Sequence, residues 1–298
     1  MASVRDLRDR IRSLKNTQQI TKAMKQVAAA KIRRAELAQK QARPYADTLS
    51  EMLRDLMASA GNVDHPFMKP GRSGAPSGVI LMTADKGLAG AFNSNVVRSA
   101  ELYRRDRPDA LFYTVGIKAR NAVRRWGLTE HPTWPINVPA KLETARDVAA
   151  RVSEDFVAGR ISDVTLISSK LVSMMSQRPE TRRLIPVEAA AHGGAAANDA
   201  GSAPAESKGP RALVEFAPSP EFVLSRLLPK YLEFTIYSAI LETDAAFYAA
   251  QLVAMNNATD NAGKLIDEYT IAMNNARQAA ITKELLEIVG GAEALTGS

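Results

Sequence analysis

The residues best placed for chemistry are those of the segment TADKGLAGAFNSN, residues 83–95. A glycine turn between a strand and a helix can bind phosphate, because free backbone N–H groups point outward at the start of the helix. The segment lacks the G-x-x-x-x-G-K-[ST] pattern, however, and Gly87 and Gly90 by themselves make a weak signal. We interpret the glycines as a tight turn within an α/β domain, and keep nucleotide binding as the alternative.

The sequence offers few residues for other kinds of catalytic chemistry. The three histidines, His65, His131 and His192, lie far apart, and none is spaced from another as metal ligands usually are. The chain has no cysteine, which excludes disulfides, zinc–thiolate sites and a cysteine nucleophile. The sequence therefore predicts a chain that is not itself an enzyme and that has no cofactor and no metal site.

Residues 3–58 are expected to form one long helix, since this stretch has no glycine and Pro44 is its only proline. Val4, Leu7, Ile11 and Leu14 recur every three or four residues. The polar run at 15–19 is expected to shift this register. After it the pattern resumes at Ile20, Met24, Val27, Ala28, Ile32, Ala35, Leu49, Leu53 and Leu56. At 1.5 Å per residue such a helix is about 80 Å long, a length typical of coiled coils.

A second helix is expected over roughly residues 220–289, with Ser219 as its N-cap, Pro220 in its first turn and Gly290–Gly291 at its end. Its small and apolar residues follow a three–four alternation over seven heptads. The heptad positions that would face a partner helix, called seats below, are Tyr231, Phe234, Ser238, Leu241, Ala245, Tyr248, Leu252, Met255, Thr259, Ala262, Ile266, Tyr269, Met273, Ala276 and Ala280. This repeat is a strong coiled-coil signal, although two helices of a larger bundle would also produce it.

The charge distribution gives the two helices opposite signs. The net charge is +7; residues 1–43 hold twelve Lys/Arg and three Asp/Glu, and residues 221–293 hold ten Asp/Glu and five Lys/Arg. Two helices of similar length and opposite charge most simply pair antiparallel. DNA binding is the alternative for the basic helix, but its basic residues are scattered and no aromatic residues alternate with them. We therefore expect no nucleic-acid partner.

The middle of the chain differs in kind. Residues 65–78 are rich in Pro and Gly and are expected to be a linker. Strand, glycine turn and helix follow from 79 and again from 110, and residues 162–187 are expected to be two strands around a turn at SQRPE. Alternating strands and helices predict a mostly parallel, Rossmann-like α/β sheet. The low-complexity stretch at 191–211 is expected to be a flexible loop.

The predicted fold class is thus a long antiparallel coiled coil with an inserted α/β domain. Its parts are a coiled-coil helix at 1–60, the α/β domain at 77–190, the loop at 191–211 and a second coiled-coil helix at 212–298. The sequence has no apolar stretch of 18 residues, so no direct membrane insertion is expected. Its charged first residues resemble neither a signal peptide nor a transit peptide.

Four motifs resemble those of one family. NTQQITKAMKQVAAAKIRRAE at 16–36, ADKGLAGAFNSNV, PSPEFVLSRLLPKYLE and ARQAAITKELLEIVGGAEAL at 276–295 are similar, in order, to gamma subunits of F-type (proton-translocating) ATP synthase. The resemblance covers the full length of the chain, and its C-terminal motif is highly specific.

The resemblance implies a central rotor shaft, the central stalk, inside a ring of three alpha and three beta subunits. Such a shaft couples proton flow at the membrane c-subunit ring to ATP synthesis on beta, and the epsilon subunit is its further partner. The catalytic sites belong to beta. A bacterial, peripheral protein at the cytoplasmic face of the inner (plasma) membrane is implied.

The resemblance also assigns residues. Arg277, Gln278 and Thr282 correspond to the catch that faces beta, and Met24 and Lys25 lie in the matching N-terminal motif. Lys22, Lys31, Arg33 and Arg34 would add positive charge there, although a solvated helix face explains these four equally well. An apolar bearing at the top of the ring would receive the tip residues Ile281, Leu285, Leu286, Ile288 and Val289.

Some positions depart from the family pattern. Ala89 stands where relatives often have Cys, and Ala217 stands where a Glu commonly precedes Pro-Ser-Pro, which puts a rotor-ring contact there in doubt. Gln251 replaces a common Arg, so one catch contact is expected to be absent or moved. Two other classes stay open: a stand-alone coiled-coil scaffold, and a nucleotide-binding enzyme supported only by the turn at 85–90.

Overall fold

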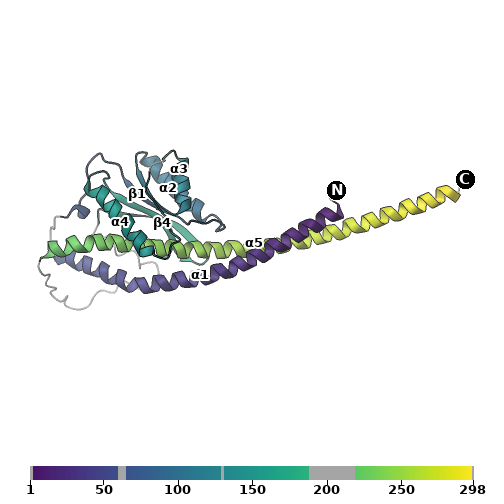
Figure 1. Cartoon of the computed structure of the whole chain (residues 1–298), viewed down its shortest axis with the longest axis horizontal. Helices are drawn as coiled ribbons and strands as arrows, with labels where there is room; N and C mark the ends of the chain where they lie inside the picture. Colours follow the sequence, from purple (N-terminus) through teal and green to yellow (C-terminus); the bar gives the residue numbers. More distant parts are fainter. Residues whose placement is uncertain (1–2, 60–64, 129–130, 188–218, 297–298) are drawn as a thin grey trace. The chain divides into compact units, whose positions relative to one another are not determined.

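The computed structural model describes residues 3–59, 65–128, 131–187 and 219–296. These residues belong to two compact units, one made of residues 1–30 and 251–298 and the other of residues 31–250. Two long helices contribute to both units: α1 (Val4–Ser59) and α5 (Pro220–Thr296) (Figure 1). The predicted loop at 191–211 lies outside the described residues.

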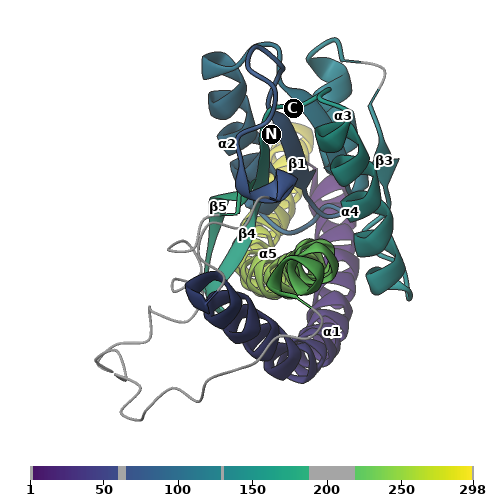
Figure 2. The same ribbon diagram turned by 90° about the vertical axis from the view of Figure 1, so that its left-hand side faces the viewer.

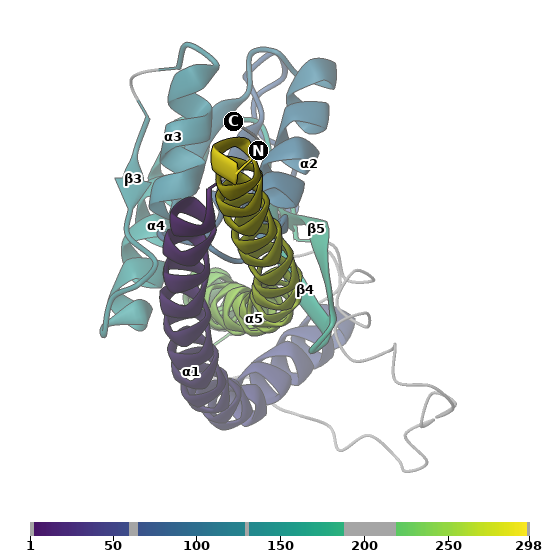
Figure 3. The ribbon, with the colours of Figure 1, turned by 90° about the vertical axis from the view of Figure 1, so that its right-hand side faces the viewer.

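In the first unit α1 and α5 run antiparallel. The contacts pair Lys25 with Asn256, Thr21 with Thr259, Gln18 with Gly263 and Arg10 with Tyr269, so the α5 number rises as the α1 number falls. Figure 3 shows the first part of α1 running alongside α5. The predicted antiparallel pairing of the terminal helices is confirmed.

The predicted seam, the line of residues along which the two helices meet, is confirmed for α5 as far as Ala276, but its last predicted position, Ala280, is exposed. The seam of α1 needs a larger correction. Seats of α5 from Met255 to Ala276 are buried or half-buried, but α1 keeps one unbroken three–four register through its polar run. Its seats are Val4, Leu7, Ile11, Leu14, Gln18, Thr21, Lys25 and Ala28. Ile20 and Val27 are instead 60% and 56% exposed. The predicted register shift was wrong because polar side chains that bond across the seam replace apolar ones there.

The helix boundaries are close to those expected. Ser219 caps α5 as predicted, since its Oγ accepts a hydrogen bond from the backbone N–H of Phe222 at 3.2 Å. The predicted end at Gly290–Gly291 was wrong, because α5 continues to Thr296. Glycine weakens a helix by about 1 kcal/mol relative to alanine, but it does not forbid one.

The second unit contains a five-stranded mixed sheet in the order β3-β2-β1-β4-β5. The strands are β1 (Gly78–Met82), β2 (Leu111–Val115), β3 (Thr133–Trp134), β4 (Val164–Ser173) and β5 (Ser176–Ile185). The first four are parallel, and β5 pairs antiparallel with β4. The inserted mostly parallel α/β sheet is confirmed.

Helices cover both faces of this sheet (Figures 1 and 2). Val79 and Leu81 of β1 pack under α2 (Phe92–Asp106) and α3 (Ile117–Arg125). Ile80 and Met82 face the other way and share a core with α4 (Lys141–Val157) and with parts of α1 and α5. Because β1 is buried on both faces, its sequence is a continuous apolar run rather than an alternating one.

Two local predictions need correction. The turn of the β4–β5 hairpin lies at Met174–Met175, and the SQRPE stretch belongs to β5 itself. Pro179 is accommodated because β5 is an edge strand, where a missing N–H does not break a ladder on both sides. The sequence interpretation also omitted α4, and it described 65–78 as linker where a short 3-10 helix, Pro66–Met68, buries Phe67.

Candidate functional site

The glycine turn is occupied by its own side chains. Asp85 accepts hydrogen bonds from the backbone N–H groups of Ile117 and Asn137, both at 2.9 Å, and the hydroxyl of Thr83 accepts one from Ala119 at 2.6 Å. Two of these contacts bind N–H groups at the start of α3, the helix that follows β2. Thr83 and Asp85 therefore hold this part of the backbone together.

A glycine is required where the turn meets β2. Gly116 has a φ of 99°, and a Cβ placed on it would lie 2.1 Å from the carbonyl oxygen of Thr83. On the α2 side, Asn93 accepts a hydrogen bond from the N–H of Ala84 at 3.1 Å and donates to the carbonyl of Lys86 at 3.1 Å. Thr83, Asp85 and Asn93 of this segment thus each bind backbone groups.

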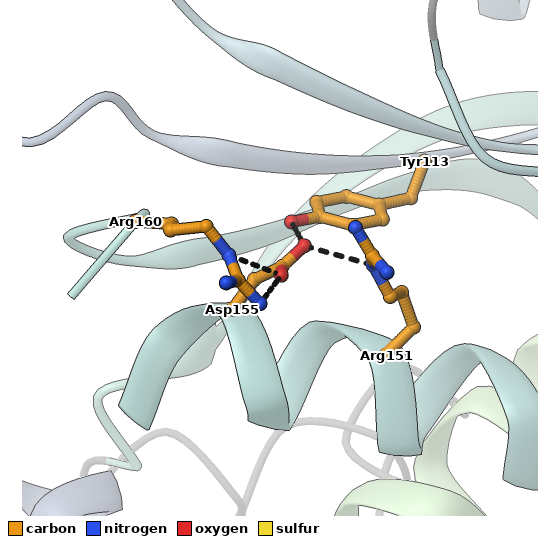
Figure 4. A network of polar contacts seen from close by, with 4 residues as sticks. All are labelled: Tyr113, Arg151, Asp155 and Arg160. Atoms are coloured by element: carbon orange, nitrogen blue, oxygen red, sulfur yellow. Dashed lines mark hydrogen bonds and ion pairs between the residues drawn. The ribbon is translucent and has the colours of Figure 1, made fainter. Parts of the chain in front are cut away.

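A second polar cluster surrounds Asp155 on α4 (Figure 4). Tyr113 donates a hydrogen bond to its carboxylate at 2.6 Å, and Arg151 and Arg160 donate through their Nε atoms at 3.2 and 2.6 Å. Burial tends to raise the pKa of Asp155, but the hydrogen bonds from Tyr113 and Arg160 and the two guanidinium charges outweigh it and lower the pKa. Burial and the neighbouring carboxylate raise the pKa of Tyr113. This cluster joins β2 to α4 and is structural.

The histidines are not brought together. The Nδ1 atom of His65 accepts a hydrogen bond from the backbone N–H of Phe67 at 3.1 Å and caps the short 3-10 helix. His131 lies near Arg120 and Arg124, and burial is the main cause that lowers its pKa. His192 is outside the described residues. Within the described ranges no group of three or more His, Cys, Asp or Glu side chains could hold a metal ion.

The most distinctive surface is the far end of α5, in the first unit. Every residue from 277 to 290 is exposed, and α5 continues beyond the start of α1 (Figure 1). The five predicted tip residues, Ile281, Leu285, Leu286, Ile288 and Val289, are 49–68% exposed. At 100° per residue they form an apolar arc of about 160°, opposite a charged arc that contains Lys283 and Glu287. Such a surface on a protein in water indicates a partner.

The predicted catch residues of α5 lie at the base of this tip. Arg277 and Gln278 are exposed, and the hydroxyl of Thr282 donates to the carbonyl of Gln278 at 2.9 Å within the helix. Met24 is half-buried on α1. Lys25 is directed into the seam, where its Nζ lies 2.5 Å from Asn256 Oδ1. The structure thus separates Lys25, which has a partner inside the coiled coil, from Arg277 and Gln278, whose polar ends face outward.

The other basic residues of α1 also differ. Lys22, Arg33 and Arg34 are exposed. Lys31, in the second unit, has its Nζ 5.1 Å from the centre of the Tyr248 ring, a cation–π contact. Burial, together with Asp244 and Asp85, raises the pKa of Tyr248 to about 12, so its hydroxyl stays neutral.

Sequence reasoning missed the outward apolar residues Ile20 and Val27 because apolar residues near a heptad seat were taken to be in the seam. The signal was present, since Gln18, Thr21 and Lys25 continue the spacing of four and three from Leu14. It also missed Leu88, which is 63% exposed and has a φ of 61°.

These features together define a class of protein. Two long antiparallel helices, an inserted α/β layer, a turn filled by its own side chains and an exposed amphipathic tip describe a stalk subunit that works through its partners. Among the described residues no helix is long and apolar enough to cross a membrane.

Comparison with known proteins gives the family. A family profile described as ATP synthase matches residues 3–295. The chain is 43% identical to the ATP synthase gamma chain of Heliobacterium modesticaldum over 296 residues, covering 99% of this chain and 100% of that one. It is also 43% identical to the gamma chain of Phenylobacterium zucineum over 305 residues, with the same coverage. The chain therefore belongs to the ATP synthase gamma-chain family, the non-catalytic rotor subunits of the central stalk.

Solved structures share the fold at lower identity. A chain of the Euglena gracilis mitochondrial ATP synthase, in a structure of its OSCP, F1 and c-ring, matches with a TM-score of 0.66 at 19% identity. The match covers 98% of this chain and 94% of that one. A central stalk and c-ring structure from Tetrahymena thermophila matches with a TM-score of 0.57 at 22% identity, over 80% of this chain and 99% of that one.

Proposed function

We propose that this chain is the shaft that carries torque between a proton-driven membrane ring and three catalytic beta subunits. Its partners are then three alpha and three beta subunits around one copy of this chain, the epsilon subunit and the c-subunit ring. Its place is the cytoplasmic face of a bacterial inner membrane. In solved mitochondrial relatives the matching chain lies in assemblies with F1 and the c-ring, which supports this set of partners.

The observation that carries the proposal is the uncovered end of α5. Residues 277–290 have no covering element in the described chain, and large apolar side chains occupy one side of that end. Burying such side chains stabilises a complex by about 1.5–3 kcal/mol each when burial is complete. An apolar lining also suits a rotating contact, because no directional bond has to break as the tip turns.

Torque additionally needs contacts that depend on angle. Arg277, Gln278 and Thr282 are proposed to bond to one beta subunit at a time, because a single shaft presents one side to each of three equivalent neighbours. A contact that one beta conformation makes better than another shifts that subunit toward the favoured conformation. Met24 and Lys25 are proposed to form a second contact with beta, at another height along the coiled coil. There the Lys25–Asn256 contact has to open before Lys25 can reach outward.

The test is Arg277→Ala in a complex assembled with the alpha and beta subunits of the same organism. We expect assembly to be unchanged and ATP hydrolysis to fall by about tenfold or more, because a charge-assisted hydrogen bond contributes about 1.5–3 kcal/mol and about 1.4 kcal/mol corresponds to tenfold in rate. Lys283→Ala is the matched control, since Lys283 lies on the charged arc of the same helix and pairs with Glu287 at 3.6 Å. Equal turnover in the Arg277 variant and the control would count against the catch assignment.

A further inference from the structure

The α/β layer holds α5 through polar contacts on two sides. The acidic residues Glu233, Glu242 and Asp244 of α5 each contact a different part of that layer, all within the second unit. Glu233 accepts a hydrogen bond from Arg146 Nε of α4 at 3.2 Å, and Asp244 forms an ion pair with Lys141 at the start of α4. The side chains of Glu233 and Asp244 are only 12% and 11% exposed.

The third acidic residue faces the opposite way. Glu242 is half-buried beside the β4–β5 hairpin, where burial and the nearby Glu180 raise its pKa, and a backbone hydrogen bond from Leu171 and the charges of Lys170 and Arg182 only partly offset this. At 100° per residue Glu233 and Asp244 lie about 20° apart around α5, and Glu242 lies about 160–180° from both. Polar contacts therefore flank the apolar face of α5, with ion pairs to α4 on one side and the β4–β5 hairpin on the other.

The apolar face between these flanks supplies adhesion but little resistance to turning. Leu228, Leu232, Ile236 and Ile240 of α5 are buried against the layer, and apolar contact is non-directional. A rotation of α5 about its own axis can exchange one apolar neighbour for another, but it must break a polar contact on one flank whichever way it turns. The cost is greatest at Asp244, whose nearly buried carboxylate would lose Lys141 without gaining full hydration, whereas Glu233 also pairs with Lys230 of α5 at 2.8 Å.

We propose that Lys141 and Arg146 of α4, Glu233, Glu242 and Asp244 of α5, and the Leu171 backbone of β4 form an α5 clamp, which fixes the rotational position of the shaft helix in the α/β layer. Its residues are positioning residues, and they contact neither nucleotide nor a catalytic group. The clamp rests on the proposed torque-carrying function, because torque received by the α/β layer has to pass into α5.

The direct test is the angular stiffness of the shaft in the assembled complex. Because the chain has no cysteine, Asn121→Cys on the exposed side of α3 provides one attachment point for a probe on an immobilised complex of alpha, beta and this chain. The probe's spread of angles during pauses between steps is compared for the wild type, Lys141→Glu and the double variant Lys141→Glu/Asp244→Lys. Arg105→Glu on α2, which breaks a surface ion pair with Glu101, controls for the change of charge.

We expect Lys141→Glu to widen the spread of angles, and the double variant to restore the wild-type spread because the pair is rebuilt with its charges exchanged. Arg105→Glu should leave the spread unchanged. A Lys141→Glu spread equal to that of the control, or no restoration in the double variant, would overturn the clamp. If the probe on the wild-type complex does not turn at all, that result would contradict the proposed function, and with it the clamp, which rests on that function.

If Lys141→Glu does not assemble, ionic strength gives the same information. Salt screens the Arg146–Glu233 pair, whose Arg146 side chain is 55% exposed, so the wild-type spread should widen as salt is raised. Lys141→Met/Arg146→Met removes both α4 charges of the clamp, so its spread should respond less. Equal responses in the two proteins would contradict the clamp.

Discussion

At the scale of single residues, two carboxylates of the α/β layer hold parts of the fold together. Asp85 binds two backbone N–H groups, and Asp155 binds one tyrosine and two arginines. Their described contacts are made within the chain, and they join β2 to α4 and the turn after β1 to the start of α3.

Asp155 makes a testable contribution to stability. Its pKa is lowered in the folded chain, so it stabilises the fold above the unfolded carboxyl pKa of about 3.9, and this stabilisation is lost as pH falls through the folded pKa. We expect Asp155→Asn to lower the free energy of unfolding by about 1–3 kcal/mol at neutral pH, and by less near pH 3 or below. Urea unfolding followed by Trp126 and Trp134 fluorescence measures both. A penalty of equal size at both pH values would contradict this role.

Gly116 gives a second residue-scale prediction. Gly116→Ala should destabilise the α/β layer by about 1–3 kcal/mol, since its Cβ would lie within 2.1 Å of the Thr83 carbonyl at a φ of 99°. Gly87→Ala is the matched control, because nothing lies within 4 Å of a Cβ at that position. The same urea titration compares the two variants. Equal stability would show that Gly116 is not confined as described.

At the scale of elements, periodicity predicted most of the architecture. The two terminal helices and the strands around the glycine turn follow from spacing and from turn residues. Gln18, Thr21 and Lys25 continue the spacing of the α1 seam, but they were not assigned to it because they are polar and their cross-helix partners are unknown until the helices are paired. For the same reason the outward position of Ile20 was hidden. The end of α5 was misjudged because two glycines are only a weak stop signal.

The α1 register can be tested by cross-linking. Gln18→Cys with Gly263→Cys should form a disulfide readily under mild oxidation, because the Gln18 side-chain nitrogen lies 3.2 Å from a Cβ placed on Gly263. Ile20→Cys with Gly263→Cys is the control, since Ile20 points outward. The chain has no other cysteine to compete. Preferential cross-linking of the Ile20 pair would support the register shift predicted from the sequence and would contradict the polar seam.

Polar seats in a coiled coil restrict its alignment. The hydroxyls of Thr21 and Thr259 lie 2.8 Å apart, and Lys25 contacts Asn256. Moving one helix along the other would leave these groups unpaired, whereas a purely apolar seam could slide more easily. Directional contacts of this kind fix register at some cost in stability, which suits a shaft that must not slip under load.

At the scale of the whole molecule, the candidate functional surface is the exposed end of α5, which no other described element of the chain covers. The candidate site was predicted by resemblance rather than by spacing, because exposed residues on a helix have no intramolecular contacts from which a role can be inferred. The structure adds that the tip is amphipathic, with Lys283 and Glu287 opposite the apolar arc. The tip therefore has two chemically different sides.

The tip residues should affect the stability of the assembled complex and not the stability of the isolated chain. Leu285→Ser/Leu286→Ser/Ile288→Ser is expected to change the stability of the isolated chain little, since these side chains are exposed. The assembled complex should have a lower melting temperature, because buried apolar area is lost at the interface. Lys283→Ser/Glu287→Ser is the control. A complex that melts as the control does would show that the tip is not covered there.

The most direct measurement is co-expression of this chain with the alpha and beta subunits of the same organism, followed by native mass determination and an ATP hydrolysis assay. We predict a complex of three alpha, three beta and one copy of this chain, with activity that depends on its presence. Absence of the complex, together with ATP bound by the isolated chain, would contradict the shaft function and return attention to the turn at 85–90.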